Sequence, residues 1–135
     1  MFELEFVDEK DCKNLNPQVL AFIGDGVYSL FIRHKILLAE NIKGQELHNS
    51  VTNYVKASGQ SNFINKLLPI FNEEELALFK RARNYKTQSQ SKNANIIDYK
   101  RATGFEAVVG YLYLSGKIDR LNEILELCIG EKDEN

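Results

Sequence analysis

Apolar residues recur every three or four positions along most of this chain, and that period favours helices over strands. The pattern is clear from Gln18 to about Glu40, after an Asn16-Pro17 pair that is typical of a helix start. It returns from Ile97 to Leu114, where Gly116 marks the end. The run VVGYLYL has a strand-like composition, but it continues the helical period from Ala102. We therefore predict an all-α fold.

Shorter segments with the same period account for the rest of the chain. We expect helices at about Gln45–Ala57, Ser61–Leu68, Glu73–Asn84 and Asp119–Ile129. Asn72 is a good cap for the third of these helices, and Asp119 is expected to cap the last. The polar stretch 85–95 is expected to be a loop. With 135 residues, the chain is expected to form a single domain over residues 1–135.

The composition argues against membrane, secreted and zinc-binding proteins. The apolar run Val108–Leu114 is far shorter than the roughly 20 residues that span a bilayer. The N-terminal sequence MFELEFVDEK is acidic where a signal peptide is basic. Cys12 and Cys128 form neither a CxxC pair nor a disulfide framework, and His34 and His48 lack metal-ligand spacing. We expect a cytoplasmic protein with no membrane partner.

Charge is distributed unevenly, although the net charge is only −2. Residues 1–11 carry five acids and one lysine, and so do residues 123–135. Between them, residues 80–101 contain seven lysines and arginines and a single acid, Asp98. A basic middle between acidic ends suggests a face that binds a polyanion. A basic run taken alone is more often a solvated surface, so this interpretation depends on what lies beside it.

Two acids interrupt apolar helical stretches: Asp25 in LAFIGDGVY and Glu106 in TGFEAVVG. A buried carboxylate is costly unless it is paired, hydrogen-bonded or bound to a metal. If the two helices pack together, both acids would converge on a hard cation such as Mg²⁺, which takes oxygen ligands and keeps several waters. Two simpler interpretations stay open. The GDG sequence is also typical of a turn that lets Asp25 cap a late helix, and Glu106 also fits the solvated edge of its stripe.

These segments resemble a known family. The sequence NPQVLAFIGDGVYSLF (16–31) resembles the signature helix of the ribonuclease III catalytic domain, and TGFEAVVGYLYLSG (103–116) resembles its second acidic motif. The segments ELHN (46–49), YVKASGQ (54–60) and FKRARN (79–84) are similar to the Mini-ribonuclease III subclass. That subclass consists of the catalytic domain alone, so we expect no double-stranded-RNA-binding domain here. The resemblance covers roughly Asn16 to Ile129.

The resemblance implies a ribonuclease III-like helical fold, an obligate homodimer and endonucleolytic cleavage of double-stranded RNA. It also implies dependence on Mg²⁺, for which Mn²⁺ would substitute. For the subclass, the implied substrate is precursor 23S ribosomal RNA, trimmed where its 5′ and 3′ ends pair into a stem. A ribosomal protein that presents this substrate is a further candidate partner.

The resemblance assigns catalytic and metal-binding roles to Asp25 and Glu106. Full-length enzymes of the family carry two further acids, one turn before each of these, and here those positions are Ala21 and Thr103. With two carboxylates, Mg²⁺ would need water and substrate phosphate as its other ligands. The expected reaction is attack by a metal-activated water on the phosphodiester, which leaves a 5′-phosphate and a 3′-hydroxyl.

The basic segment supplies the expected grip on RNA, because A-form duplexes are recognised through phosphates and 2′-hydroxyls. We predict that the RNA-binding residues are Arg81, Arg83, Asn84, Lys86, Lys92, Lys100 and Arg101. Two other functions stay open. A catalytically inactive RNA-binding or ribosome-assembly factor would explain the missing acids at positions 21 and 103. A helical protein–protein adaptor is the other, but it would explain neither the embedded acids nor the basic segment.

Overall fold

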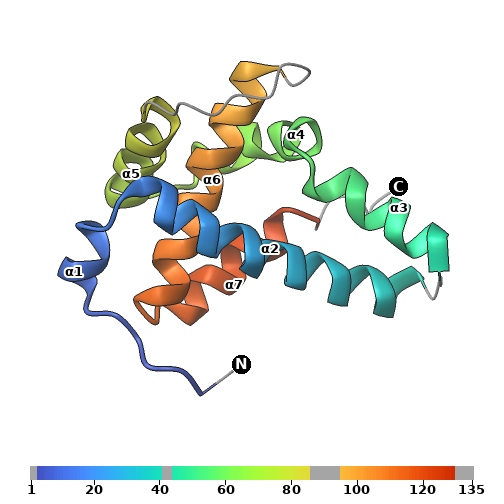
Figure 1. Cartoon of the computed structure of the whole chain (residues 1–135), viewed down its shortest axis with the longest axis horizontal. Coiled ribbons are helices and arrows are strands. Elements are labelled where there is room, and N and C mark those ends of the chain that lie inside the picture. The colour runs from blue at the N-terminus through green and yellow to red at the C-terminus, as the bar shows by residue number, and fades with distance from the viewer. Residues whose placement is uncertain (1–2, 41–43, 86–94, 130–135) are drawn as a thin grey trace.

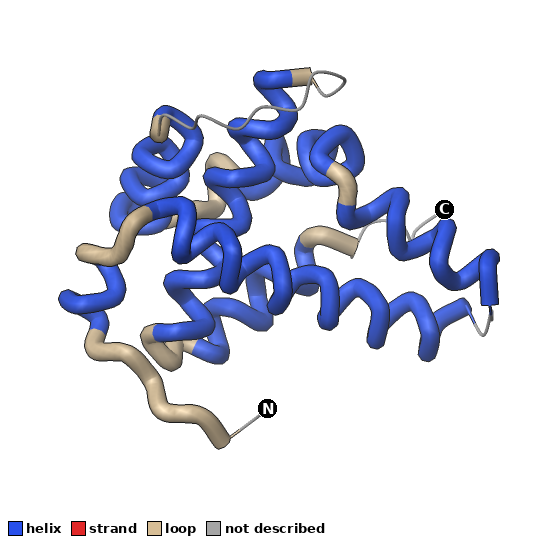
Figure 2. Tube along the Cα trace, viewed as in Figure 1, coloured by secondary structure: helices blue, strands red, loops and turns tan. Residues whose placement is uncertain are grey.

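Two long helices, α2 (Pro17–Glu40) and α6 (Ile96–Leu114), cross near the centre of the molecule (Figure 1). The computed structural model describes residues 3–40, 44–85 and 95–129. Around the crossing lie the shorter helices α1 (Glu9–Lys13), α3 (Gly44–Val55), α4 (Ala57–Leu67), α5 (Glu73–Asn84) and α7 (Ile118–Leu127). Helices α1, α4, α5 and α7 contact α6, whereas α3 contacts α2 and α4. The described residues contain no strand, which confirms the predicted all-α fold (Figure 2).

The helix signals in the sequence are confirmed at three ends. The Asn16 side chain accepts a hydrogen bond from the backbone nitrogen of Gln18 at 2.7 Å, at the start of α2. Asn72 and Glu75 form a reciprocal capping box at the start of α5, with N···O distances of 2.8 and 2.9 Å. Gly116 takes a positive φ of 79° after α6, a conformation that favours glycine.

Three features differ from the sequence prediction. Helix α4 begins at Ala57, earlier than the expected start at Ser61. The predicted cap at Asp119 is wrong, because α7 begins at Ile118 after Lys117 and Asp119 lies inside the first turn. The short helix α1 was not predicted, since five residues are too few to show a helical period. Of the predicted loop 85–95, residues 86–94 lie outside the described residues.

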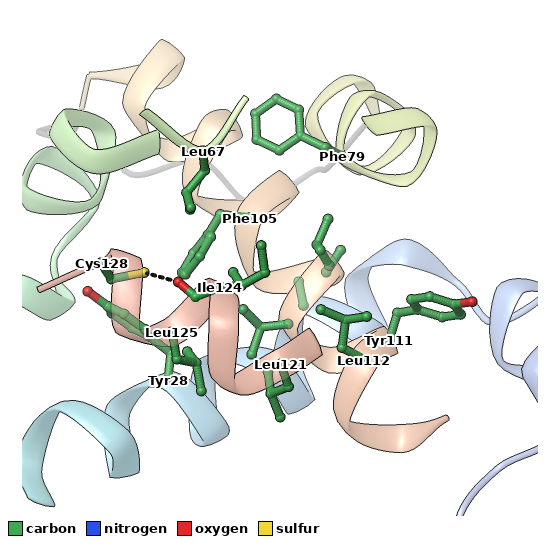
Figure 3. Close-up of a cluster of buried hydrophobic side chains, with 14 of the residues drawn as sticks. Tyr28, Leu67, Phe79, Phe105, Tyr111, Leu112, Leu121, Ile124, Leu125 and Cys128 are labelled. Atoms are coloured by element: carbon green, nitrogen blue, oxygen red, sulfur yellow. Dashed lines mark hydrogen bonds between the residues drawn. The ribbon is translucent and has the colours of Figure 1, made fainter. Parts of the chain in front are cut away.

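Aromatic side chains from α2, α4 and α6 pack together in the core. The rings of Tyr28, Phe63 and Phe105 pack pairwise with centroid distances of 5.1 to 5.8 Å. Figure 3 shows Phe105 among the labelled core side chains, with Tyr28 and Cys128 nearby. Phe105 is fully buried and directly precedes Glu106, so the core anchors the segment of α6 that carries this acid. None of the described helices is long and apolar enough to span a membrane.

An ion pair between the buried Glu75 and the partly exposed Arg120 ties α5 to α7. Arg120 donates to both carboxylate oxygens of Glu75 at 2.7 and 2.8 Å, and also to the carbonyl oxygen of Ile70 at 2.9 Å. Burial tends to raise the pKa of Glu75, but the hydrogen bond and charge of Arg120 and the backbone hydrogen bond of Asn72 hold that pKa below its usual value. This pair fixes the N-terminal end of α5, whose C-terminal end carries the RARN segment.

Candidate active site

Glycines let the backbones of α2 and α6 touch where they cross. A Cβ on Gly24 would overlap the carbonyl oxygen of Glu106, and a Cβ on Gly110 would overlap the carbonyl oxygen of Leu20. Helix α2 runs without a break through residues 24–26, so GDG is not a turn in this chain. Although glycine lowers helix propensity, Gly24 is required here by the close approach of the two backbones.

The same contact brings Asp25 and Glu106 to one pocket. Both side chains line a cavity of about 210 Å³ between α2, the end of α5 and α6. Asp25 is exposed, whereas Glu106 is half-buried. The prediction was that the two acids converge if their helices pack together. The helices do pack, and both acids line the same pocket.

The environment of Glu106 disfavours a negative charge. Burial is the main reason that its pKa is raised to about 8, and the charge of Asp25 and a hydrogen bond with Asp25 raise it further. A hydrogen bond from the buried amide of Gln60 acts in the opposite direction. The donor nitrogen of Gln60 lies 3.1 Å from Oε2 of Glu106. A cation between the two carboxylates would relieve their mutual repulsion.

The ligand set of this pocket fits a hard divalent cation. Asp25 and Glu106 offer carboxylate oxygens, the ligands that Mg²⁺ prefers. One turn before them, Ala21 and Thr103 also line the pocket. Ala21 has no polar side chain, and the Thr103 hydroxyl donates to the carbonyl oxygen of Tyr99 at 3.0 Å. Within the described chain, no third His, Cys, Asp or Glu completes a metal-binding group, so water and substrate would have to supply the other ligands.

Two of the predicted RNA-binding cations lie at this pocket. Arg83 and Lys100 are among its lining residues, from the last turn of α5 and the first turns of α6. The Arg83 guanidinium lies 5.8 Å from the centroid of the Phe79 ring, and its Nε donates to Asn84 at 3.1 Å. The basic segment therefore reaches the acids in space, although the sequence separates them.

The other predicted RNA-binding residues are placed differently. Arg81 is exposed and donates to the carbonyl oxygen of Lys13 at 2.9 Å. Arg101 is held against α4, where it donates to Ser61 and to Asn65 at distances of 2.7 to 3.2 Å. Lys86 and Lys92 lie outside the described residues.

Several pocket residues were not predicted from the sequence. Gln18, Phe22, Tyr85 and Tyr99 line the pocket, and the Asn16 amide donates to the Tyr85 hydroxyl at 2.9 Å. Gln18 and Tyr99 each lie seven residues before one of the acids, two turns along the same helical stripe. That spacing is a usable signal once the acids are identified. Gln60 gave no such signal, because its burial depends on how α4 packs.

Known proteins are similar to this chain in both sequence and fold. The Ribonuclease III domain family matches residues 18–117. A Mini-ribonuclease 3 of Clostridium tetani is 46% identical over 94% of this chain and 85% of its own length. A Mini-ribonuclease 3 of Brevibacillus brevis is 47% identical over 87% of each chain. A crystal structure of a protein from Fusobacterium nucleatum matches with a TM-score of 0.78 and 31% identity, over 90% of this chain and 98% of that one.

These matches agree with the geometry of the pocket, where two carboxylates on crossing helices lie beside basic side chains. The domain match covers most of the chain, and the chain spans more than four fifths of the length of each named relative. The chain therefore belongs to the ribonuclease III family, in its Mini-ribonuclease 3 branch, and is an endoribonuclease.

Proposed function

We propose that the chain cleaves double-stranded RNA with Mg²⁺, or with Mn²⁺ in its place, at the pocket that contains Asp25 and Glu106. The observation that carries this proposal is the convergence of the two carboxylates beside Arg83 and Lys100. Acids that hold a divalent cation next to bases that hold phosphates are what phosphodiester hydrolysis requires.

The residues of the pocket are assigned different roles in the proposed reaction. When bound, the divalent ion lowers the pKa of water and offsets negative charge on the leaving 3′ oxygen. Asp25 and Glu106 would hold that ion, and the scissile phosphate would bind between these acids and the basic side chains of Arg83 and Lys100. Hydrolysis of the bond to the 3′ oxygen leaves a 5′-phosphate and a 3′-hydroxyl. No nucleophilic side chain is required.

We propose that the duplex is bound by the cations in the last turn of α5 and the first turns of α6, here called the basic rim. We assign phosphate contacts to Arg81, Arg83, Lys100 and Arg101, and a 2′-hydroxyl contact to Asn84. Recognition by phosphates and 2′-hydroxyls reads the A-form shape rather than a base sequence. We propose the paired ends of precursor 23S ribosomal RNA as the natural substrate, with a ribosomal protein as a candidate presenting partner. Support for this substrate comes from the subclass resemblance.

A second copy of the chain completes the proposed enzyme. An apolar groove of about 770 Å³ runs along α2 and is lined by Val27, Leu30, Phe31, Tyr113 and Leu125, among others. Leu30 is 47% exposed in the single chain, and apolar patches of this kind mark interfaces. A symmetric dimer through this face would present two pockets, one for each RNA strand.

Cleavage of a labelled RNA duplex that mimics the 23S stem tests the proposal. The wild type is compared with Asp25→Asn and Glu106→Gln, with and without Mg²⁺. We expect each variant to lose cleavage by on the order of 100-fold or more while it still binds the duplex. Asp119→Asn, which removes an exposed acid on α7, is the control and should cleave normally. Full Mg²⁺-dependent cleavage by Asp25→Asn would refute the assignment, and binding without cleavage by the wild type would indicate an inactive RNA-binding factor.

A further inference from the structure

Gln60 is a buried polar residue that the proposed chemistry does not yet explain. It lies in the first turns of α4 and is only 1% exposed. The described chain buries two other polar side chains to a similar degree, Ser29 and Glu75. Glu75 is balanced by Arg120, which donates to both of its oxygens. The side-chain oxygen of Gln60, in contrast, accepts no hydrogen bond from the described residues.

The neighbours of Gln60 fix the orientation of its amide. Nε2 donates to the carbonyl oxygen of Val55 at 2.8 Å and to Oε2 of Glu106 at 3.1 Å. An amide nitrogen has two hydrogens, so both are used. Turning the amide over would place its oxygen against the carbonyl oxygen of Val55, which cannot donate a hydrogen bond. The observed orientation is therefore the one that keeps a donor on Glu106.

The other end of the amide is left unsatisfied. Oε1 of Gln60 is buried and has no hydrogen-bond partner among the described residues. A buried acceptor without a partner destabilises a fold, and the described side chains contain a single case. An apolar side chain of the same length would avoid this problem. The amide of Gln60 therefore interacts with the described residues only through its donor side, which contacts Val55 and Glu106.

We infer that Gln60 is a positioning residue, whose amide holds Oε2 of Glu106 so that the carboxylate faces Asp25 and the pocket. This inference rests on the proposed function, since it requires Glu106 to act in cleavage. Gln60 is not among the residues that line the pocket, so it acts through Glu106 rather than by touching RNA. Loss of a partner that orients a metal ligand typically costs about 10- to 100-fold in metal affinity or activity.

Two substitutions at Gln60 separate positioning from packing. Gln60→Met keeps the length and removes the donor, and Gln60→Glu keeps the shape while placing an acceptor against Glu106. We would measure kcat and KM for the duplex, and the dissociation constant of Mn²⁺ by calorimetry without RNA. For both variants we expect kcat to fall by about 10-fold or more and the Mn²⁺ dissociation constant to rise by a similar factor. KM for the duplex should stay within about twofold of wild type, because RNA contacts are untouched.

Ile64→Val is the matched control, since Ile64 is fully buried one turn later on the same helix. It should lower the melting temperature yet leave kcat and Mn²⁺ affinity unchanged. Wild-type kcat and Mn²⁺ affinity in the Gln60 variants would overturn the inference, as would a rise in KM alone. If Gln60→Met fails to fold, Gln60→Glu decides. Glu106→Gln is measured in parallel. Full cleavage by Glu106→Gln would refute the proposed function. If Glu106→Gln is inactive and Gln60→Met is fully active, only the role of Gln60 is refuted.

Discussion

Gly24 of α2 lies directly against the main chain of Glu106 in α6, so close that a Cβ at residue 24 would overlap the Glu106 carbonyl oxygen. The residue after Gly24 is Asp25. The contact that sets the helix crossing therefore also sets the distance between the two acids. The stability of the helix crossing and the proposed catalysis therefore depend on the same pair of backbone positions.

Substitution of Gly24 should damage both properties. Gly24→Ala would force the helices apart, with an expected cost of about 1–3 kcal/mol and a loss of cleavage. Gly26→Ala is the control for packing within the chain, because its Cβ would meet no atom of this chain within 4 Å; Gly26 also lines the proposed dimer groove, so the mass of the variant is measured too. That variant should gain about 1 kcal/mol from better helix propensity. Thermal unfolding and cleavage rates are measured for both variants. Equal losses of stability and cleavage in Gly24→Ala and Gly26→Ala would contradict this account.

Adding an acid to the pocket should strengthen metal binding. Thr103 lines the pocket one turn before Glu106, and its hydroxyl is used only within its own helix. Thr103→Asp would supply a third carboxylate, so we expect the Mg²⁺ concentration for half-maximal cleavage to fall by about 3- to 10-fold. Thr103→Asn has the same shape without the charge and should show no such fall. A titration of cleavage rate against Mg²⁺ measures both.

Two adjacent cations on α6 should respond differently to substitution. Lys100→Ala should reduce the slope of log affinity against log salt by about 1, because one phosphate contact is lost. Arg101→Ala should in addition lower the free energy of unfolding by about 1–3 kcal/mol, because Arg101 is hydrogen-bonded to Ser61 and Asn65. Duplex binding at several salt concentrations and chemical denaturation separate the two effects. An unchanged slope in both variants would count against the proposed rim.

An acid placed in the apolar groove should separate the proposed dimer. Leu30→Glu introduces a charge among apolar lining residues, and we expect light scattering to report a monomer. Leu38→Glu is the control, since Leu38 is 70% exposed on the same helix but does not line the groove. It should leave the mass unchanged. A wild type that is already monomeric at working concentration would refute the dimer.

The Glu75–Arg120 pair predicts a dependence of stability on pH. Because the folded pKa of Glu75 is lowered, its stabilising effect is complete above the usual glutamate pKa and is lost as the pH falls through the folded value. At neutral pH, Glu75→Gln should cost about 2 kcal/mol, and this difference from wild type should shrink as the pH falls below the usual glutamate pKa of about 4.3. The exposed neighbour Glu73 serves as the control, with little effect expected from Glu73→Gln. A difference that stays constant with pH would contradict the assignment.

Local chemistry made much of the fold predictable. Asn72 and Gly116 act through contacts within a few residues, and the structure confirms both. Helical spacing also placed Asp25 and Glu106 correctly on their helices, because a period needs no knowledge of the partner helix. Asp119 was misassigned because Lys117 takes the cap position without a side-chain hydrogen bond, and no sequence preference favours that choice.

Features that depend on tertiary packing could not be predicted. In the sequence, Gly24 is only a residue with weak helix propensity. Glycine is needed there because of a contact with the main chain of Glu106, more than 80 positions away. Gln60 looks like an ordinary polar residue, yet α4 carries it into the interior beside Glu106. Arg101 looks like any other base of its segment, and only the position of α4 shows that it is already hydrogen-bonded.

The lining that this chain supplies to the proposed catalytic pocket comes from α2, α6 and the end of α5. In the proposed dimer, the second copy would bring the same pocket to the opposite strand of the duplex. In the proposed dimer, a mixed assembly of one intact and one Asp25→Asn subunit would become a nickase that scores one strand of a duplex and leaves the other whole. Pairing would then determine how many strands are cut in one encounter, and the two acids of each subunit would determine whether its own strand is cut.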